Sequence, residues 1–264
     1  MIRFDGVTRK YGEKVAVSDL RLEIPPGELF AFLGPNGAGK TTAIKMLVGL
    51  LRPSSGRVTV CGHDIVAQPR DAARCLGYVP DEPYLYDKLS GREFLEFVAG
   101  MRGLSAAETA SGIARESDRF ELGGFLDDLT ETYSHGMRQR LVFASAVLHD
   151  PPALVVDEPM VGLDPRSMRL VKDLLRRRTA AGRAVFMSTH TLSIAEEIAD
   201  RIGIIHLGRV RFLGTLAQMR EAVRRDYASL EHMFLEMTDG GNGTGDLADS
   251  AAASSPAARE DAAS

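Results

Sequence analysis

The sequence predicts a mixed α/β fold with an inserted helical region, and three observations support this prediction. Short apolar segments bounded by glycine or proline alternate with amphipathic segments, as strands and helices do in α/β proteins. Helical patterns dominate from about residue 84 to residue 145. The length of 264 residues, with 44% hydrophobic and 26% charged residues, is ordinary for a globular chain of one or two domains.

The first quarter of the chain predicts an antiparallel strand pair, a buried strand and a helix. Met1–Val7 and Val15–Ile24 alternate apolar and polar residues, which is typical of antiparallel strands. Leu29–Leu33 is continuously apolar and predicts a strand that is buried on both faces. Thr41–Leu51 carries apolar residues at helical spacing, and Arg57–Cys61 predicts a further strand.

The rest of the chain continues this alternation. The predicted helices are Glu93–Met101, Ala106–Glu116, Leu141–Leu148, Arg166–Arg178 and Ile194–Arg201. The predicted strands are Ala153–Val156, Val185–Ser188 and a hairpin of Ile202–Leu207 with Arg209–Leu213. We expect one domain over residues 1–238, with a helical subdomain at about 84–145. Residues 239–264 are rich in Ala, Gly, Ser and Asp, which predicts a disordered tail because so few apolar groups are available for burial.

Composition excludes several classes of protein. The formal net charge of -4 argues against the basic surface of a nucleic-acid-binding protein. The longest apolar runs are far shorter than the ~18 residues of a membrane-spanning helix, and the first residues lack the apolar core of a signal peptide. Two cysteines, Cys61 and Cys75, favour a reducing compartment over a disulfide scaffold, and we expect both to be inert.

A glycine-rich segment between a predicted strand and a predicted helix indicates a phosphate-binding loop. It fits the pattern G-x-x-x-x-G-K-[ST] and consists of Gly34, Pro35, Asn36, Gly37, Ala38, Gly39, Lys40, Thr41 and Thr42. Glycines allow backbone N–H groups to converge on phosphate oxygens at the positive end of the following helix. Lys40 would reach the β- and γ-phosphates, and the Thr41 hydroxyl would bind Mg²⁺. The fold class is therefore that of a P-loop NTPase core: a mixed sheet with flanking helices and an N-terminal antiparallel β subdomain.

Two carboxylates at the end of another apolar strand complete this first inference. Asp157 and Glu158 follow Ala153–Val156 directly. Asp157 can bind Mg²⁺ directly or through water, and Glu158 can polarise the attacking water. Strands often end in acidic residues, but together with the phosphate loop this pair predicts binding and hydrolysis of a nucleoside triphosphate.

Five further elements narrow the class. They are Tyr11, the run Gly77–Glu82, the run Tyr133–Arg140, Asp164 within Val161–Pro165, and His190 after Ser188-Thr189. In this order the sequence closely resembles the ATP-binding subunit of ABC transporters over about residues 1–238. Taken singly, an aromatic beside a turn, a histidine after a strand and an aspartate before a proline are all common structural features. Their joint order carries the resemblance.

The resemblance implies a role for each of these positions. Tyr11 would stack on adenine, and Asp81, at the family's Q-loop position, would join Thr41 and Asp157 near Mg²⁺. Lys40, His190 and Glu158 would be the catalytic residues, with Glu158 as general base and His190 on the γ-phosphate. Ser134, Gly136 and Asp164 would meet ATP bound by the opposite subunit, so that two MgATP lie between head-to-tail protomers. Ser134 precedes a predicted helix, whose first N–H groups suit an anion.

Two departures from the family pattern suggest a subgroup. Asp81 stands where most of the family has glutamine, and His135 and Met137 stand where glycine and glutamine are usual, whereas Ser134 and Gly136 are kept. These features resemble the ATP-binding subunits of type-two ABC exporters.

The function implied is energy coupling in an export complex. ATP and Mg²⁺ are the expected cofactors. A separate multi-span permease and a second copy or a related ATPase are the expected partners, at the cytoplasmic face of the membrane, and no nucleic acid is expected. The alternative is a soluble ABC-type ATPase acting in DNA repair, chromosome organisation or translation. A binding module without turnover is a third possibility, which intact Glu158 and His190 disfavour.

Overall fold

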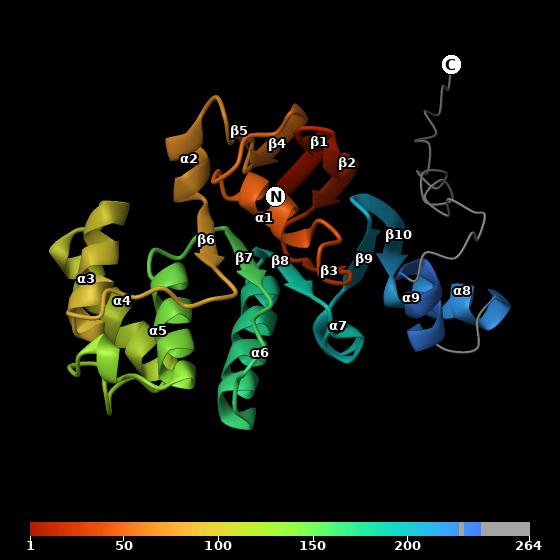
Figure 1. The fold of residues 1–264 in the computed structure, drawn as a ribbon. Coiled ribbons are helices and arrows are strands. Elements are labelled where there is room, and N and C mark those ends of the chain that lie inside the picture. The colour runs from red at the N-terminus through yellow and green to blue at the C-terminus, as the bar shows by residue number, and fades with distance from the viewer. Residues whose placement is uncertain (227–229, 239–264) are drawn as a thin grey trace, which may run out of the picture.

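The computed structural model describes residues 1–226 and 230–238, which form two sheets and their covering helices (Figure 1). The predicted tail, residues 239–264, lies outside the described residues. The smaller sheet has the strand order β2-β1-β4-β5 and is antiparallel. Its strands are β1 (Ile2–Tyr11), β2 (Lys14–Ile24), β4 (Ser55–Val60) and β5 (His63–Asp64).

The larger sheet has the strand order β10-β9-β3-β8-β7-β6, and its strands are parallel except for β10. They are β3 (Leu29–Leu33), β6 (Leu76–Val79), β7 (Ala153–Asp157), β8 (Ala184–Thr189), β9 (Arg201–His206) and β10 (Arg209–Thr215). Every residue of β3, β7 and β8 is buried, as the continuous apolar runs predict.

Helices cover both faces of the larger sheet. They are α1 (Lys40–Leu47), α2 (Pro69–Arg74), α3 (Gly91–Arg102), α4 (Ala106–Arg119), α5 (His135–Val147), α6 (Pro165–Ala180), α7 (Leu192–Ile198), α8 (Leu216–Asp226) and α9 (Leu230–Thr238). A short 3₁₀ helix, η1 (Thr130–Thr132), precedes α5. In the part of the chain that the structure describes, no helix combines the length and apolarity that crossing a membrane requires.

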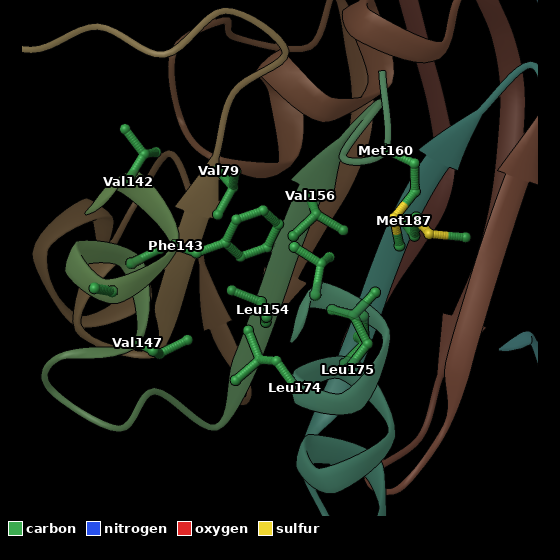
Figure 2. Packing of buried hydrophobic residues seen from close by; sticks show 14 of the residues in the cluster. Val79, Val142, Phe143, Val147, Leu154, Val156, Met160, Leu174, Leu175 and Met187 are labelled. Carbon is green, nitrogen blue, oxygen red and sulfur yellow. The ribbon is translucent and has the colours of Figure 1, made fainter. Parts of the chain in front are cut away.

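Alternate residues of β3 serve two separate cores. Leu29, Ala31 and Leu33 belong to a cluster with α5, α6 and α7, whereas Phe30 and Phe32 belong to a cluster with α1 and the antiparallel sheet. Figure 2 shows the first cluster, where side chains of α5 and α6 lie against β7. The sheet is therefore the middle layer of three, which is the architecture predicted for an α/β core.

The inserted helices α3, α4 and α5 lie together at the β6 end of the larger sheet (Figure 1). Capping boxes fix the start of α3 at Ser90 and of α4 at Ser105, each with a glutamate three residues later. The predicted fold class is confirmed. The predicted limit of the helical subdomain near residue 145 falls inside α5, so this domain boundary stays a prediction.

The predicted ends of two helices were wrong, and one strand of the larger sheet was not predicted. The helix predicted to run to Leu51 ends at Leu47, and Gly49 adopts a left-handed φ of 79° just beyond it. The helix predicted to run to Arg201 ends at Ile198, because Arg201 pairs with Phe30 as the first residue of β9. Strand β6 was not predicted, since it has four residues and includes a glycine.

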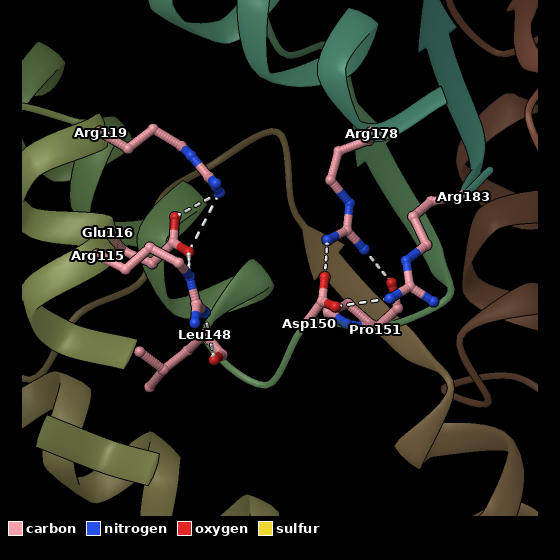
Figure 3. A network of polar contacts seen from close by, with 8 residues as sticks. All are labelled: Arg115, Glu116, Arg119, Leu148, Asp150, Pro151, Arg178 and Arg183. Atoms are coloured by element: carbon pink, nitrogen blue, oxygen red, sulfur yellow. Dashed lines mark hydrogen bonds and ion pairs between the residues drawn. The ribbon is translucent and has the colours of Figure 1, made fainter. Parts of the chain in front are cut away.

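A polar network joins the inserted helices to the larger sheet (Figure 3). Asp150, between α5 and β7, accepts hydrogen bonds from Arg178, at the end of α6, and from Arg183 at 2.6 Å. Partial burial opposes ionisation of Asp150, but the two guanidinium groups outweigh it and lower the pKa of the carboxyl. Arg178 is 7% exposed and depends on this carboxylate for its counter-charge, because the Pro151 carbonyl oxygen, which also accepts a hydrogen bond from it, is uncharged.

We predict that Asp150→Asn lowers the free energy of unfolding by about 1–2 kcal/mol at neutral pH, because a nearly buried guanidinium loses its counter-charge. The difference in stability between wild type and Asp150→Asn should shrink below about pH 4. Because the pKa of Asp150 is lower in the folded chain than in the unfolded chain, its ionisation stabilises the fold above the unfolded pKa, and this stabilisation is lost as pH falls through the folded pKa. Urea unfolding at a series of pH values measures this difference in the free energy of unfolding.

Asp5→Asn is the matched control. Its carboxylate is also 55% exposed, but its partner Arg21 is 66% exposed, so the loss should stay under about 0.5 kcal/mol. Equal losses in the two variants would contradict the role given to the buried arginine.

Candidate functional site

The phosphate loop predicted from sequence joins β3 to α1, as expected. Gly37 and Gly39 adopt φ values of 79° and 118°, which side chains rarely adopt. A Cβ on Gly34 would lie 2.4 Å from the Ile205 carbonyl oxygen, and a Cβ on Gly39 would lie 2.7 Å from the Ala16 carbonyl oxygen. The loop is thus packed so closely on neighbouring backbone that these positions require glycine.

Parallel strands bring the other predicted groups to the same edge of the sheet. β3 pairs with β8 and β8 pairs with β7, so that Asp157 stands opposite Ser188, and Leu33 opposite Thr189. The segments that follow the three strands therefore leave the sheet side by side, as is usual for ligand sites of open α/β sheets.

Lys40, Glu158 and His190 form one cluster at this edge. The Glu158 carboxylate lies 3.4 Å from the Lys40 ammonium and 2.9 Å from Nδ1 of His190. Lys40 also donates a hydrogen bond of 2.6 Å to the Gly34 carbonyl oxygen. Lys40 is 6% exposed and Glu158 17%, whereas His190 is 51% exposed. Of the three residues assigned to catalysis from sequence, Glu158 therefore contacts both of the others.

Asp157 is buried and incompletely hydrogen-bonded. One carboxylate oxygen accepts a hydrogen bond from the Ser188 hydroxyl, while Oδ2 is buried without a partner. Burial raises the pKa of Asp157, and the carboxylates of Asp81 and Glu158 raise it further, against the Ser188 hydrogen bond and the Lys40 charge. An orphaned carboxylate oxygen beside other acidic groups fits a divalent cation such as Mg²⁺, which takes oxygen ligands.

A cleft of about 610 Å³ opens over the loop. Among the residues predicted from sequence, those lining it are Tyr11, Pro35, Asn36, Gly37, Gly39, Lys40, Thr41, Thr42, Asp81 and Glu158. Tyr11 is 46% exposed, and the Arg9 guanidinium lies 4.6 Å from the centroid of its ring. A larger concavity of about 940 Å³ lies between α3 and α4 and contains none of the predicted residues.

Ser134, Gly136 and Asp164 do not line the cleft; they lie together elsewhere. Ser134 caps α5 by accepting a hydrogen bond from the Met137 N–H. Asp164 caps α6, and its Oδ2 would lie 3.2 Å from a Cβ on Gly136. Within one protomer these residues therefore shape a second surface, built from the first turns of two helices.

Sequence reasoning missed two parts of the cleft. Ser188 donates to the Asp157 carboxylate and accepts from the Glu158 N–H at 3.0 Å, so one hydroxyl holds both the side chain of Asp157 and the backbone of Glu158. Its place before Thr189-His190 was the available signal. Gly208 donates its N–H to the Ala38 carbonyl oxygen at 2.8 Å, and neighbouring Leu207 lines the cleft. No motif connects this hairpin turn with the phosphate loop.

Comparison with known proteins agrees with this geometry. The model of the family described as "ABC transporter" matches residues 17–161. The daunorubicin/doxorubicin resistance ATP-binding protein DrrA of Streptomyces peucetius is 38% identical, over 84% of this chain and 67% of the relative. The Nod factor export ATP-binding protein I of Paraburkholderia xenovorans is 37% identical, over 79% of this chain and 68% of the relative.

Solved structures give the same result. An ATP-binding subunit of an ABC transporter matches with a TM-score of 0.84 and 32% identity, over 90% of this chain and 99% of its own. A dimeric bacterial ABC transporter cassette matches with a TM-score of 0.74 and 25% identity, over 82% of this chain and 99% of its own. The chain therefore belongs to the ABC transporter family, as an ATP-binding and ATP-hydrolysing subunit.

Proposed function

We propose that the chain is the energy-coupling subunit of an ABC export complex, in which it binds two MgATP between head-to-tail protomers and drives a separate permease. The observation that carries the proposal is the contact of Glu158 with both Lys40 and His190, since Lys40 and Glu158 line the cleft over the phosphate loop. The relatives named for drug resistance and Nod factor export support the direction of transport.

The positive groups around this cleft and its position over the phosphate loop suit a nucleotide. Backbone N–H groups of residues 34–42 and the first turn of α1 would hold the phosphates, with Lys40 on the β- and γ-phosphates. Tyr11, at the rim, would stack on the adenine. Thr41, Asp157 and Asp81 would hold Mg²⁺, which when bound neutralises phosphate charge. The orphaned Oδ2 of Asp157 supports this assignment.

The ion pair in the cleft suggests how ATP activates the general base. The Lys40 ammonium lies 3.4 Å from the Glu158 carboxylate and offsets its charge. Triphosphate oxygens carry more negative charge than one carboxylate and compete for the same ammonium. As Lys40 turns to the phosphates, Glu158 is released to accept a proton from the attacking water, while His190 holds the γ-phosphate and keeps Glu158 oriented through their hydrogen bond.

The second surface supports the requirement for a dimer. Ser134 and Gly136 lie at the start of α5, whose first turn contains no acidic residue, and neither lines the cleft of its own protomer. Helix N-termini attract phosphate. In a head-to-tail dimer this surface would close over the γ-phosphate bound by the other copy, and Asp164 beside it would cross the same interface. The dimeric cassette among the structural relatives supports this arrangement.

An exposed aromatic patch supports a permease partner. Tyr84 is 76% exposed and Met101 74%, and Tyr86 and Phe97, whose ring centroids are 5.5 Å apart, are nearly half exposed. The patch lies on α3 and on the segment that leads to α3 from Asp81, which lines the cleft. A partner bound there would be connected to the nucleotide site through this segment. We place the chain at the cytoplasmic face of the membrane through this contact.

The alternative, a soluble ABC-type ATPase in DNA repair or translation, is not favoured, because the relatives are named for resistance and export. Purification of the complex in detergent separates the two. Recovery of a multi-span membrane protein with the chain supports the transport function, and its loss on Tyr84→Glu/Met101→Glu would locate the contact. Recovery without any multi-span partner would contradict it.

We predict that Glu158→Gln lowers the ATPase rate about 10²–10⁴-fold while ATP binding persists, because the amide cannot accept a proton but keeps the shape of the side chain. Steady-state phosphate release and fluorescent-nucleotide titration measure the two effects. Glu82→Gln is the control and should keep the wild-type rate, because Glu82 is exposed and does not line the cleft. An undiminished rate in Glu158→Gln would refute the proposed general base.

We predict that Ser134→Arg prevents ATP-dependent dimerisation without weakening ATP binding to a single protomer, because the residue lies outside the cleft. The hydrolysis-deficient Glu158→Gln background keeps ATP in place during the measurement. Light scattering should then give a dimer for Glu158→Gln and a monomer for the double variant at saturating ATP. A dimer in both would show that Ser134 is not at the interface.

A further inference from the structure

Arg9 lies against the aromatic ring at the rim of the nucleotide cleft. Arg9 and Tyr11 both belong to β1 and are two residues apart, a spacing that points side chains to the same face of a strand. The guanidinium carbon of Arg9 lies 4.6 Å from the centroid of the Tyr11 ring, within the range of a cation–π contact. Tyr11 lines the cleft and Arg9 does not. One face of the ring is therefore covered by a cation from outside the cleft.

The loop between α1 and β4 holds Arg9 in this place. The Arg9 guanidinium donates a hydrogen bond of 3.0 Å to the Arg52 carbonyl oxygen. The backbone beside it is tied to the same loop, because the Lys10 N–H donates to the Ser54 hydroxyl at 3.0 Å and the Ser54 N–H donates to the Thr8 carbonyl oxygen at 2.8 Å. A guanidinium can donate hydrogen bonds in its plane while its face lies on a ring. Arg9 is thus anchored by backbone groups while it contacts the ring.

The end of β1 that carries this contact is joined to the phosphate loop through β2. Arg9 stands opposite Val17 on β2, and the strand pairing skips Ala16 at the next step, as in a β-bulge. The Ala16 carbonyl oxygen packs so closely on the phosphate loop that a Cβ on Gly39 would lie 2.7 Å from it. The cleft extends from this loop to the Tyr11 ring, so that both ends of one nucleotide can be held at once.

We propose that Arg9 is a positioning residue for the base of the bound nucleotide and acts through Tyr11. The inference rests on the proposed stacking of adenine on Tyr11. Because the guanidinium covers one face of the ring, a base that enters the cleft stacks on the other face and completes a sandwich of cation, ring and base. A ring that is already held loses less conformational freedom when the base binds. Arg9 therefore strengthens nucleotide binding without touching the nucleotide.

Titrations with ADP and with pyrophosphate test this role, because only ADP carries a base and neither is a substrate of an ATPase. We expect Arg9→Ala to raise the Kd for MgADP about 2–5-fold, the loss of one partly exposed cation–π contact, and to leave the Kd for magnesium pyrophosphate unchanged. In ATP hydrolysis the same variant should raise KM to a similar extent and leave kcat unchanged, because it removes binding and not transition-state stabilisation. Calorimetric titration of the full-length chain measures each Kd.

A double-mutant cycle shows whether Arg9 acts through the ring. Tyr11→Ala removes the stacking surface and should raise the Kd for MgADP about 5–150-fold. Addition of Arg9→Ala to Tyr11→Ala should raise the Kd no further, because the group through which Arg9 acts is already absent.

Lys10→Ala is the matched control. Lys10 is the next residue of β1, is exposed and does not line the cleft. The variant removes one positive charge close to the site but keeps the contact of Arg9 with the ring. Its Kd for MgADP should equal that of the wild type.

The possible failures can be told apart. Weaker pyrophosphate binding by Arg9→Ala, a further loss when it is added to Tyr11→Ala, or an equal loss in Lys10→Ala would overturn the role of Arg9 through the ring. Unchanged ADP binding in Arg9→Ala together with a loss in Tyr11→Ala would overturn the inference and leave the proposed nucleotide site intact. Unchanged ADP binding in Tyr11→Ala would contradict the stacking itself, and this inference with it.

Discussion

The parallel pairing of β3, β8 and β7 is the constraint on which the site depends. It places the phosphate loop, the Asp157–Glu158 pair and His190 at one edge, although they are far apart in sequence. Each strand is buried on both faces, so the backbone positions are fixed by two cores at once. Rigid placement of this kind suits phosphoryl transfer, which depends on positioning and charge more than on covalent chemistry.

Glu158 links the ammonium of Lys40 and the imidazole of His190 inside a single protomer. Lys40 and Glu158 are largely shielded from water and His190 is half exposed, while Asp157 keeps one oxygen without a hydrogen-bond partner. The residues expected to act on a second copy lie apart, on the starts of α5 and α6. Division of the machinery between two surfaces is the structural reason for expecting cooperation between protomers.

Sequence reasoning predicted correctly those features whose structure is determined by residues close to them in the chain. The phosphate loop, the apolar strand before Asp157 and the cap at Ser134 are set by neighbours in the chain, and the structure has them where expected. It failed where tertiary pairing decides. Arg201 continues a helical pattern but is held in β9 by Phe30, and β6 exists because β7 lies beside it. Ser188 gained its role only when β8 aligned with β7.

Because successive residues of β3 point to opposite faces of the sheet, the fold is sensitive to a one-residue shift in this strand. Since Leu29, Ala31 and Leu33 serve one core while Phe30 and Phe32 serve the other, deletion of one residue from this strand would exchange the two sets. Phenylalanine rings would then enter the space that Leu and Ala side chains fill beneath α6 and α7. The phosphate loop would leave the strand with its residues facing the opposite side of the sheet. Deletion of one residue from β3 would thus disrupt both cores and the nucleotide site together, whereas deletion of one residue from a surface turn would change only the local structure.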